Sequence, residues 1–251
     1  MIYDSLTHAT PTGDWFGTKH DASSNTLYSQ MREYNVDKVI LSGLLQEGVN
    51  DFIIEQFLES PKSIYPLPMI ASKDFSELDA LLTYYYKIGV RGVKLHPRFL
   101  KISFQESRLD EIFELCEEKK FTLFICTVPY YEKEDFRFID ALLRKCLAWP
   151  TLKIVLLHGG YYHLLELAER VRPAENILID LSATLTRFYD SSLGLDIKYL
   201  FRNFDKRVVI GTDFPEYSYK DVKCALNYLG LPWEKALARG FLGDNLNVFL
   251  G

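Results

Sequence analysis

The sequence lacks three features, and each absence excludes a class of protein. No apolar run is long: the stretch Ile154–Leu157 is far shorter than the roughly 20 residues that a membrane-spanning helix needs. No basic region followed by an apolar stretch opens the chain, so we expect no secretion signal and a cytoplasmic protein. Positive charge is not in excess, because 29 Lys and Arg against 34 Asp and Glu leave a net charge of −5. Nucleic acids and anionic membranes are therefore poor candidate partners, and a small molecule is a better one.

Cysteine is scarce as well. The four thiols, Cys116, Cys126, Cys146 and Cys224, are widely spaced and form no C-x-x-C pair. A disulfide framework or a structural zinc site uses closely paired cysteines, so we expect reduced thiols. Three of the four fall in helical patterns and are expected to be buried or half-buried small side chains. Cys126 differs, because it lies at the end of an apolar run.

What the sequence does contain is an alternation of short apolar runs with segments of helical periodicity. Its 251 residues, 48% of them hydrophobic, match the roughly 250 residues of one (β/α)8 barrel. Several runs are apolar on both faces, as are strands of a parallel sheet covered by helices. The eight strands that we predict are Ile2–His8, Asp37–Gly43, Ile64–Ala71, Gly92–His96, Thr122–Val128, Lys153–His158, Ile177–Ser182 and Arg207–Thr212.

The predicted helices alternate with these strands. Glycine or proline follows most of them, as at Gly89, Pro150 and Gly230, which is typical of helix ends. The expected helices are Asn25–Tyr34, Asn50–Leu58, Phe75–Ile88, Leu109–Lys119, Asp135–Leu147, Tyr162–Val171, Ile197–Asn203 and Tyr219–Leu229. We therefore predict the α/β class: a single (β/α)8 TIM barrel, one domain over residues 1–251, with an extra C-terminal helical segment over Trp233–Phe249.

Polar side chains gather at the predicted strand ends. The reacting groups of a parallel barrel stand at the C-terminal ends of its strands, so polar residues there are informative. Three of the five histidines in the chain are at such places. The full set is Asp4, His8, Lys94, His96, Cys126, His158 and Asp213. This pattern predicts a polar site at the barrel mouth.

Each of these residues has a functional and a structural interpretation. His158 follows a wholly apolar run, where a buried imidazole without a partner would be costly. Asp213 emerges from an apolar strand; the alternative is that it caps a turn or the next helix. Lys94 and His96 point the same way because they are two residues apart, and a lysine aimed into a barrel needs a partner or a substrate anion. His8 shares a strand face with Asp4, and its alternative is a hydrogen-bonded residue of the barrel mouth.

Five stretches resemble the amidohydrolase superfamily, in the branch often called amidohydrolase-related or amidohydrolase 2. They read GVRGVKLHP from Gly89, LHGG from Leu157, IDLS from Ile179, IGTDFP from Ile210 and LGDN from Leu242, and they follow the family's order across most of the chain. The resemblance implies a metal-assisted hydrolase, decarboxylase or hydratase. In this family an HxH pair on strand one, histidines on strands five and six and an aspartate on strand eight hold the metal.

The sequence departs from the family pattern in two places. The first histidine of the strand-one pair is Leu6 here, and the strand-five histidine aligns with Cys126. By position, the metal ligands would be His8, Cys126, His158 and Asp213, holding one zinc or manganese ion. Leucine cannot bind a metal, whereas a thiolate is a good zinc ligand. A site with three ligands, or none with metal, therefore stays open, since some members of the superfamily are implied to work without one.

The expected function is hydrolysis of a small anionic substrate at the carbonyl of an ester, lactone or amide. Asp213 would take a proton from the attacking water, and His158, His96 or a metal would polarise the carbonyl. Lys94 and Arg98 would orient a substrate carboxylate.

Two alternatives stay open from the sequence. Decarboxylation or hydration, as in the same branch, would use the same groups. A barrel that has lost catalysis would instead serve as a binding or scaffold protein: the loss of two ligands favours this, and the presence of His158 and Asp213 opposes it. The expected partners are a small-molecule substrate and, in a homo-oligomer, further copies of the chain.

Overall fold

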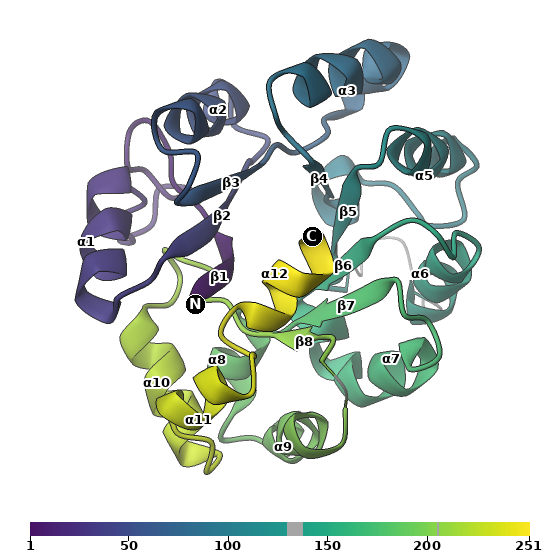
Figure 1. Cartoon of the computed structure of the whole chain (residues 1–251). Helices are drawn as coiled ribbons and strands as arrows, with labels where there is room; N and C mark the ends of the chain where they lie inside the picture. The colour runs from purple at the N-terminus through teal and green to yellow at the C-terminus, as the bar shows by residue number, and fades with distance from the viewer. Residues whose placement is uncertain (130–137, 205) are drawn as a thin grey trace.

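A computed structural model describes residues 1–129, 138–204 and 206–251. In this part of the chain, eight parallel strands surround a central axis and helices form an outer ring (Figure 1). The strands are β1 (Tyr3–Thr7), β2 (Lys38–Ser42), β3 (Ile64–Leu67), β4 (Gly92–Leu95), β5 (Thr122–Cys126), β6 (Ile154–Leu157), β7 (Ile177–Asp180) and β8 (Val208–Val209). The expected TIM barrel is confirmed.

The barrel consists of two ladders that meet near the C-terminal ends of the strands. One ladder has the order β1-β2-β3 and the other β4-β5-β6-β7-β8. Parallel bridges join them, from Met69 to Lys94 on one side and from Thr7 to Phe214 on the other. The backbone N–H of Lys94 donates to the carbonyl of Pro68 at 2.9 Å. The closure therefore fixes β4 beside the end of β3, and β1 beside the chain that follows β8.

The helices of the ring bury one apolar stripe each against the strands. In α7 (Leu164–Val171) the buried residues are Leu164, Leu167, Ala168 and Val171, the spacing of one helix face. The other α-helices are α1 (Ser24–Tyr34), α2 (Val49–Glu59), α3 (Leu78–Lys87), α4 (Pro97–Leu100), α5 (Arg108–Glu118), α6 (Phe138–Leu147), α8 (Thr184–Phe188), α9 (Leu193–Asn203), α10 (Tyr219–Tyr228), α11 (Trp233–Ala238) and α12 (Asp244–Leu250). Two 3₁₀ segments, η1 (Ser72–Glu77) and η2 (His158–His163), precede α3 and α7.

The hydrophobic core has two layers. The larger one lies between the strands and the outer helices. The smaller one fills the barrel itself with side chains from most of the strands, among them Ile40, Phe124, Val155, Leu178 and Val209. A filled interior is usual for this fold, and it separates the two ends of the barrel.

The last strand is much shorter than predicted. We expected a strand over Arg207–Thr212, but β8 covers only Val208–Val209. The N–H of Ile210 donates to Phe241 at 2.9 Å, and the N–H of Thr212 donates to the Asp4 carboxylate at 3.0 Å. Side-chain and loop partners therefore replace the ladder at this point.

Several helix boundaries also differ from the prediction. The expected helix Phe75–Ile88 begins as η1 and becomes α-helical only at Leu78. The expected start at Asp135 lies outside the described residues, and α6 is described from Phe138. We missed α4 and α8, which are only 4 and 5 residues long and too short to show a periodic pattern.

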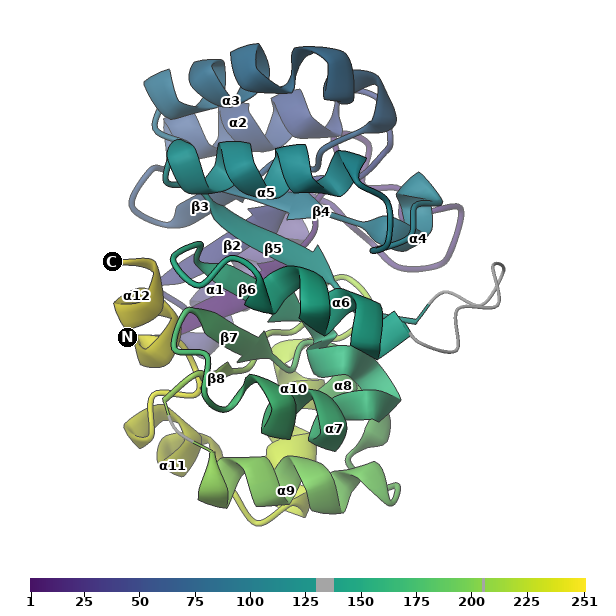
Figure 2. The same ribbon diagram turned by 90° about the vertical axis from the view of Figure 1, so that its right-hand side faces the viewer.

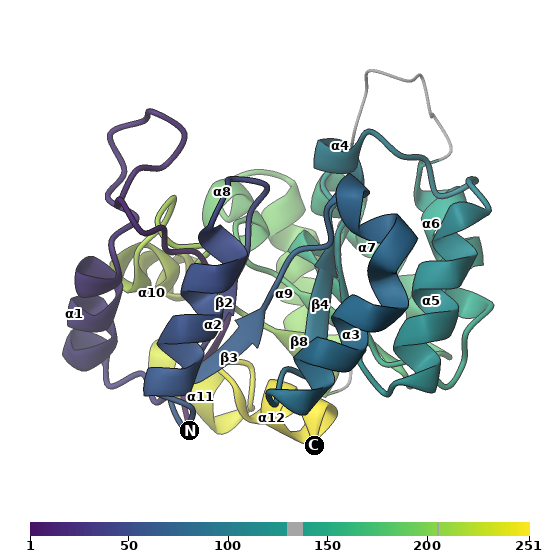
Figure 3. The ribbon, with the colours of Figure 1, turned by 90° about the horizontal axis from the view of Figure 1, so that it is seen from above.

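The predicted C-terminal segment forms two helices rather than one. Gly243 separates α11 from α12 with a φ of 143°, and an added Cβ there would lie 2.3 Å from the backbone nitrogen of Tyr3. Figures 2 and 3 show α12 and both chain termini at one end of the barrel, and α4, α8 and the loop after β1 at the opposite end. Among the described residues, no helix is both long and apolar enough to cross a membrane.

Candidate active site

Asp213 lies at the barrel mouth, four residues after β8 ends at Val209. Its N–H donates to the carbonyl of Leu6 at 2.9 Å, and its φ of 58° is in the left-handed region, a conformation that aspartate tolerates better than most residues. The residue is only 8% exposed. This backbone position turns the carboxylate toward the mouth, with the ring of His8 beside it.

His8 contacts two groups of opposite charge. Its Nε2 lies 3.5 Å from Asp213 Oδ1 and 3.5 Å from Lys94 Nζ. Its Nδ1 lies 3.0 Å from the carbonyl of Ser42; a carbonyl only accepts, so Nδ1 carries the proton and Nε2 presents a lone pair. Burial and the positive charge of Lys94 lower the pKa of His8 to about 4. His8 is therefore neutral at physiological pH.

The neutral state of His8 predicts a pH-dependent contribution to stability. Unfolded histidine takes up a proton below about pH 6.5, whereas folded His8 does so only near pH 4. The unfolded state binds more protons between these values, so the free energy of unfolding falls as the pH is lowered from 6.5 to 4. We expect His8→Gln to remove roughly 3 kcal/mol of this fall.

Urea unfolding of both proteins at a series of pH values would measure the difference. His163→Gln, at a partly exposed position, serves as the matched control. Parallel stability curves for the parent and His8→Gln between pH 6.5 and 4 would contradict the neutral assignment.

Lys94 places a buried amino group among these residues. It belongs to β4 and is only 2% exposed. Burial lowers the pKa of Lys94, and the negative charges of Cys126 and Asp213 oppose that shift. Burial alone would raise the pKa of Asp213, but the positive charges around it, those of His158 and Lys94 among them, outweigh burial and lower that pKa to about 2. Asp213 is thus held as a carboxylate.

Cys126 ends β5 and hydrogen-bonds with two imidazoles, those of His96 and His158. The Nδ1 of His158 lies 3.0 Å from the carbonyl of Ser182 and donates to it, which leaves Nε2 for the sulfur. Burial would raise the pKa of the Cys126 thiol, but His96 and His158 hold it well below its usual value. Burial would lower the pKa of His158, but Cys126 and Asp213 raise it to about 9. Both shifts favour a thiolate on Cys126 and an imidazolium on His158.

His96 lies on the other side of the sulfur. Its Nδ1 accepts from the N–H of Phe99 at 3.3 Å, and its ring stacks on that of Phe99 with centroids 4.0 Å apart. Nε2 therefore carries the proton of the neutral ring and faces Cys126. Burial lowers the pKa of His96. Arg98 follows on α4 and is exposed, with its guanidinium 5.4 Å from the Phe99 ring.

The thiolate predicts unusual reactivity for Cys126. Burial raises the pKa of Cys116 to about 12 and also raises that of Cys146, so both should stay inert toward a small alkylating reagent. We expect Cys126 to react faster than these two, and at a rate nearly constant from pH 6 to 8. Free glutathione should gain about tenfold in rate per pH unit over the same range.

Peptide mass spectrometry after timed alkylation would measure each site, and Cys126→Ser is the control for peak assignment. Equal modification of Cys116, Cys126 and Cys146 would contradict the assignment of Cys126 as a thiolate.

Asp180 accepts hydrogen bonds from residues around the site. We did not predict it as a site residue from the sequence. It ends β7 and is fully buried. The hydroxyls of Ser5 and Ser182 donate to its carboxylate, and the N–H of His158 donates to it at 3.2 Å. The available signal was a charged residue at the end of an apolar strand, within the IDLS stretch. Asp180 holds the His158 backbone, which has a left-handed φ of 65°.

Asp4 has a structural role. Its carboxylate accepts from the N–H of Leu6 at 3.1 Å and from the Thr212 hydroxyl at 2.7 Å. Burial raises the pKa of Asp4 to about 6. The residue therefore ties β1 to the chain after β8 rather than joining His8, with which it shares a strand face in the predicted pattern.

The predicted metal ligands do not form a metal centre in this arrangement. Among the described residues, no three His, Cys, Asp or Glu side chains are grouped so that they could hold a metal ion. The Nε2 lone pair of His8 faces the ammonium of Lys94, and Leu6 is a fully buried apolar residue. The donor set therefore does not fit a divalent ion as it stands. The four-ligand metal site stays a prediction, which metal analysis can test.

Comparison with known proteins places these residues in a family. The model of the amidohydrolase family matches residues 24–245. No curated protein sequence matches significantly. Among solved structures, an uncharacterised TIM-barrel protein from Bordetella bronchiseptica is similar with a TM-score of 0.79 and 16% identity, covering 99% of this chain and 98% of that one.

Two further structures are similar over the whole barrel. One is a probable 2-pyrone-4,6-dicarboxylic acid hydrolase from Acinetobacter baumannii with bound citric acid: TM-score 0.73, 14% identity, 100% of this chain and 99% of that one. The other is a 5-carboxyvanillate decarboxylase from Novosphingobium aromaticivorans with bound manganese: TM-score 0.71, 14% identity, 99% and 97%. At these identities the likeness shows the fold alone. Because the family model spans most of the sequence, this chain belongs to the amidohydrolase family.

Proposed function

We propose that this protein hydrolyses a carbonyl bond, in an ester, lactone or amide, of a small anionic substrate, and that it does so without a metal ion. One observation carries the proposal: a carboxylate held ionised, Asp213, shares the mouth of the barrel with two buried basic groups, Lys94 and His158. A base opposite cations is the arrangement that attack of water on a carbonyl needs.

The cations stabilise the charge that develops during the reaction. Attack of water turns the carbonyl oxygen into an oxyanion, and buried cations are effective there because the surroundings do not screen them. The Cys126 thiolate keeps His158 protonated, so the positive charge of His158 can stabilise this oxyanion while its two N–H groups stay with Ser182 and Cys126. Lys94 and the exposed Arg98 attract the substrate's own carboxylate, with Arg98 at the rim on α4.

Substrate binding also activates the base. The charges of Lys94 and His158 help to hold the pKa of Asp213 near 2, which is too low for an efficient base at neutral pH. A bound anionic substrate neutralises these charges, and burial then raises the pKa of Asp213. Asp213 takes the proton of the attacking water and returns it to the leaving oxygen or nitrogen as the carbon–heteroatom bond breaks.

A screen of small lactones, esters and amides, each with a free carboxylate, tests the proposal. The hydrolysed acid is the expected product. Aromatic carboxylates belong in the same screen, because one structurally similar protein is a decarboxylase and the same cations would stabilise a carbanion. Release of carbon dioxide without hydrolysis would replace the proposal by decarboxylation. Failure of every compound, with and without added zinc or manganese, would favour a barrel that only binds.

A further inference from the structure

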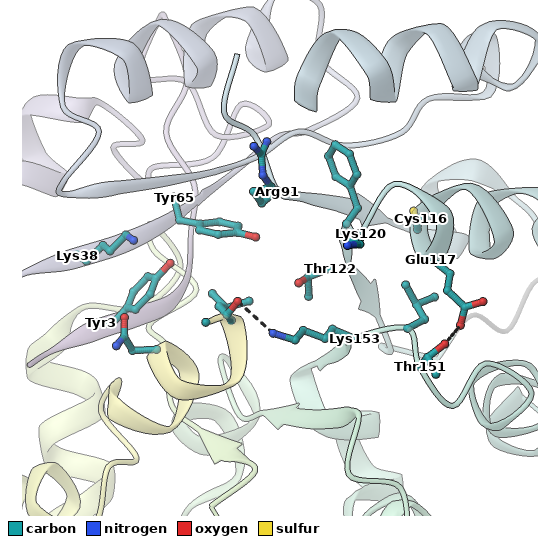
Figure 4. A pocket seen from close by; sticks show the side chains of 15 residues that line it. Tyr3, Lys38, Tyr65, Arg91, Cys116, Glu117, Lys120, Thr122, Thr151 and Lys153 are labelled. Carbon is teal, nitrogen blue, oxygen red and sulfur yellow. Dashed lines mark hydrogen bonds between the residues drawn. The ribbon is translucent and has the colours of Figure 1, made fainter. Parts of the chain in front are cut away.

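The end of the barrel opposite the candidate active site contains a cavity. Its volume is about 510 Å³, within the range of sites for small ligands. Its lining residues lie at or near the N-terminal ends of β1 to β6 and at the end of α12 (Figure 4). Phe124 and Val155 belong to the core layer that fills the barrel above it. The cavity is therefore independent of the mouth.

The lining of this cavity is strongly basic. Four cations from separate parts of the chain line it: Lys38, Arg91, Lys120 and Lys153 (Figure 4). Glu117 is the one acidic side chain among the described lining residues, and the Thr151 hydroxyl donates to it. In a protein with a net charge of −5, a net positive cavity marks a place for an anion.

Two of the cations are held in position by their neighbours. Arg91 donates through Nη1 to the carbonyls of Tyr86 and Val90, each at 2.8 Å, and its guanidinium lies 3.8 Å from the Tyr86 ring centroid. Lys153 Nζ lies 3.2 Å from the carbonyl of Leu250 in α12. These contacts neutralise neither charge, so both stay available to a ligand.

Lys38 and Tyr3 supply the strongest sign of a ligand-binding site. Lys38 is half-buried, burial lowers its pKa, and its Nζ lies 4.9 Å from the Tyr3 ring centroid and 5.8 Å from that of Tyr65. Tyr3 is 1% exposed, and its hydroxyl has no hydrogen-bond partner within the described structure. A buried hydroxyl without a partner costs free energy. Figure 4 shows this hydroxyl directed toward the cavity beside Tyr65.

We propose that this cavity is a binding site for a small organic anion with two or more negative charges, carried on phosphate or carboxylate groups. The lysines supply charge, the Tyr3 hydroxyl donates a hydrogen bond, and the rings of Tyr3 and Tyr65 give the ligand's carbon skeleton a flat surface. Burial raises the pKa of Tyr3 well above its usual value, so the phenol keeps the proton that it donates. The helix α12 closes one side through Leu250, which gives the extra C-terminal segment a role in binding.

Calorimetric titration of the full-length protein tests this site with pyrophosphate, citrate and acetate as separate probes. We expect saturable binding of pyrophosphate or citrate, and acetate at least tenfold weaker. The tighter of the first two assigns the charged group as phosphate or carboxylate. No saturation by either one up to about 10 mM, or acetate binding as tightly, would overturn the proposal.

Substitutions test whether the anion binds in this cavity. We expect the double substitution Lys38→Gln and Lys153→Gln to weaken it at least tenfold, and Tyr3→Phe to weaken it severalfold. The control pair Lys220→Gln and Lys235→Gln removes the same charge from exposed positions of α10 and α11 and should change it less than twofold. Thermal melting checks that each variant is folded. Equal weakening by the two pairs would mean that net charge, and not this cavity, attracts the anion.

Discussion

Asp213→Asn should lower kcat by roughly 10²–10⁴-fold on any substrate that the screen identifies, because it removes the general base. Asparagine has nearly the same shape and is, with aspartate and glycine, among the residues that best adopt the left-handed backbone that Asp213 has at φ 58°. The variant should therefore fold, and substrate should still bind. Steady-state kinetics, with the thermal melting curve of each protein, would measure both effects.

Glu216→Gln is the matched control for this substitution. It removes a carboxylate three residues away, on the exposed side of the same turn, and should change kcat by less than about threefold. If Asp213→Asn kept near-parental turnover while Glu216→Gln lost it, the base would be assigned to the wrong carboxylate.

Lys94→Met should lower kcat/KM by roughly 10²–10³-fold, the usual effect of removing one preorganised electrostatic contact to a developing charge. Methionine keeps much of the length of the buried lysine stem and removes only the ammonium. The way in which kcat/KM falls distinguishes two roles of Lys94. A rise in KM alone would mean that Lys94 only holds the substrate carboxylate, whereas a fall in kcat would mean that it stabilises the transition state.

The exposed Lys220→Met is the control for Lys94→Met and should behave like the parent protein. Lys94→Met should also raise the pKa of His8, because the charge that helps to lower it is gone. NMR titration of the imidazole would detect that shift independently of activity. An unchanged His8 titration together with unchanged kcat/KM would remove Lys94 from the site.

The position of the site could be predicted from the sequence because parallel strands bring their C-terminal ends together. Lys94, Cys126 and His158 are far apart in the chain, yet each follows or ends an apolar run. Strand periodicity alone directs Lys94 and His96 to the same face. The catalytic and substrate-binding roles of these residues, and of Arg98, stay predictions.

The contacts within the site could not be predicted in the same way. The approach of Lys94 to His8 depends on how the two ladders close at Met69 and Thr7, and no periodicity encodes that register. The orientation of each imidazole comes from a backbone carbonyl, at Ser42 for His8 and Ser182 for His158. Every residue has a backbone carbonyl, so the sequence does not indicate which carbonyls accept a hydrogen bond from a histidine ring.

We propose that Lys94 and His158, rather than a metal ion, supply the positive charge at this barrel mouth. The most direct test is the metal content of protein purified without chelator, measured with the activity of the same sample before and after exhaustive chelation. We predict zinc and manganese far below one equivalent per chain, and activity that chelation does not change. One equivalent of either metal, lost together with activity in His158→Ala, would contradict the claim and restore the four-ligand metal site.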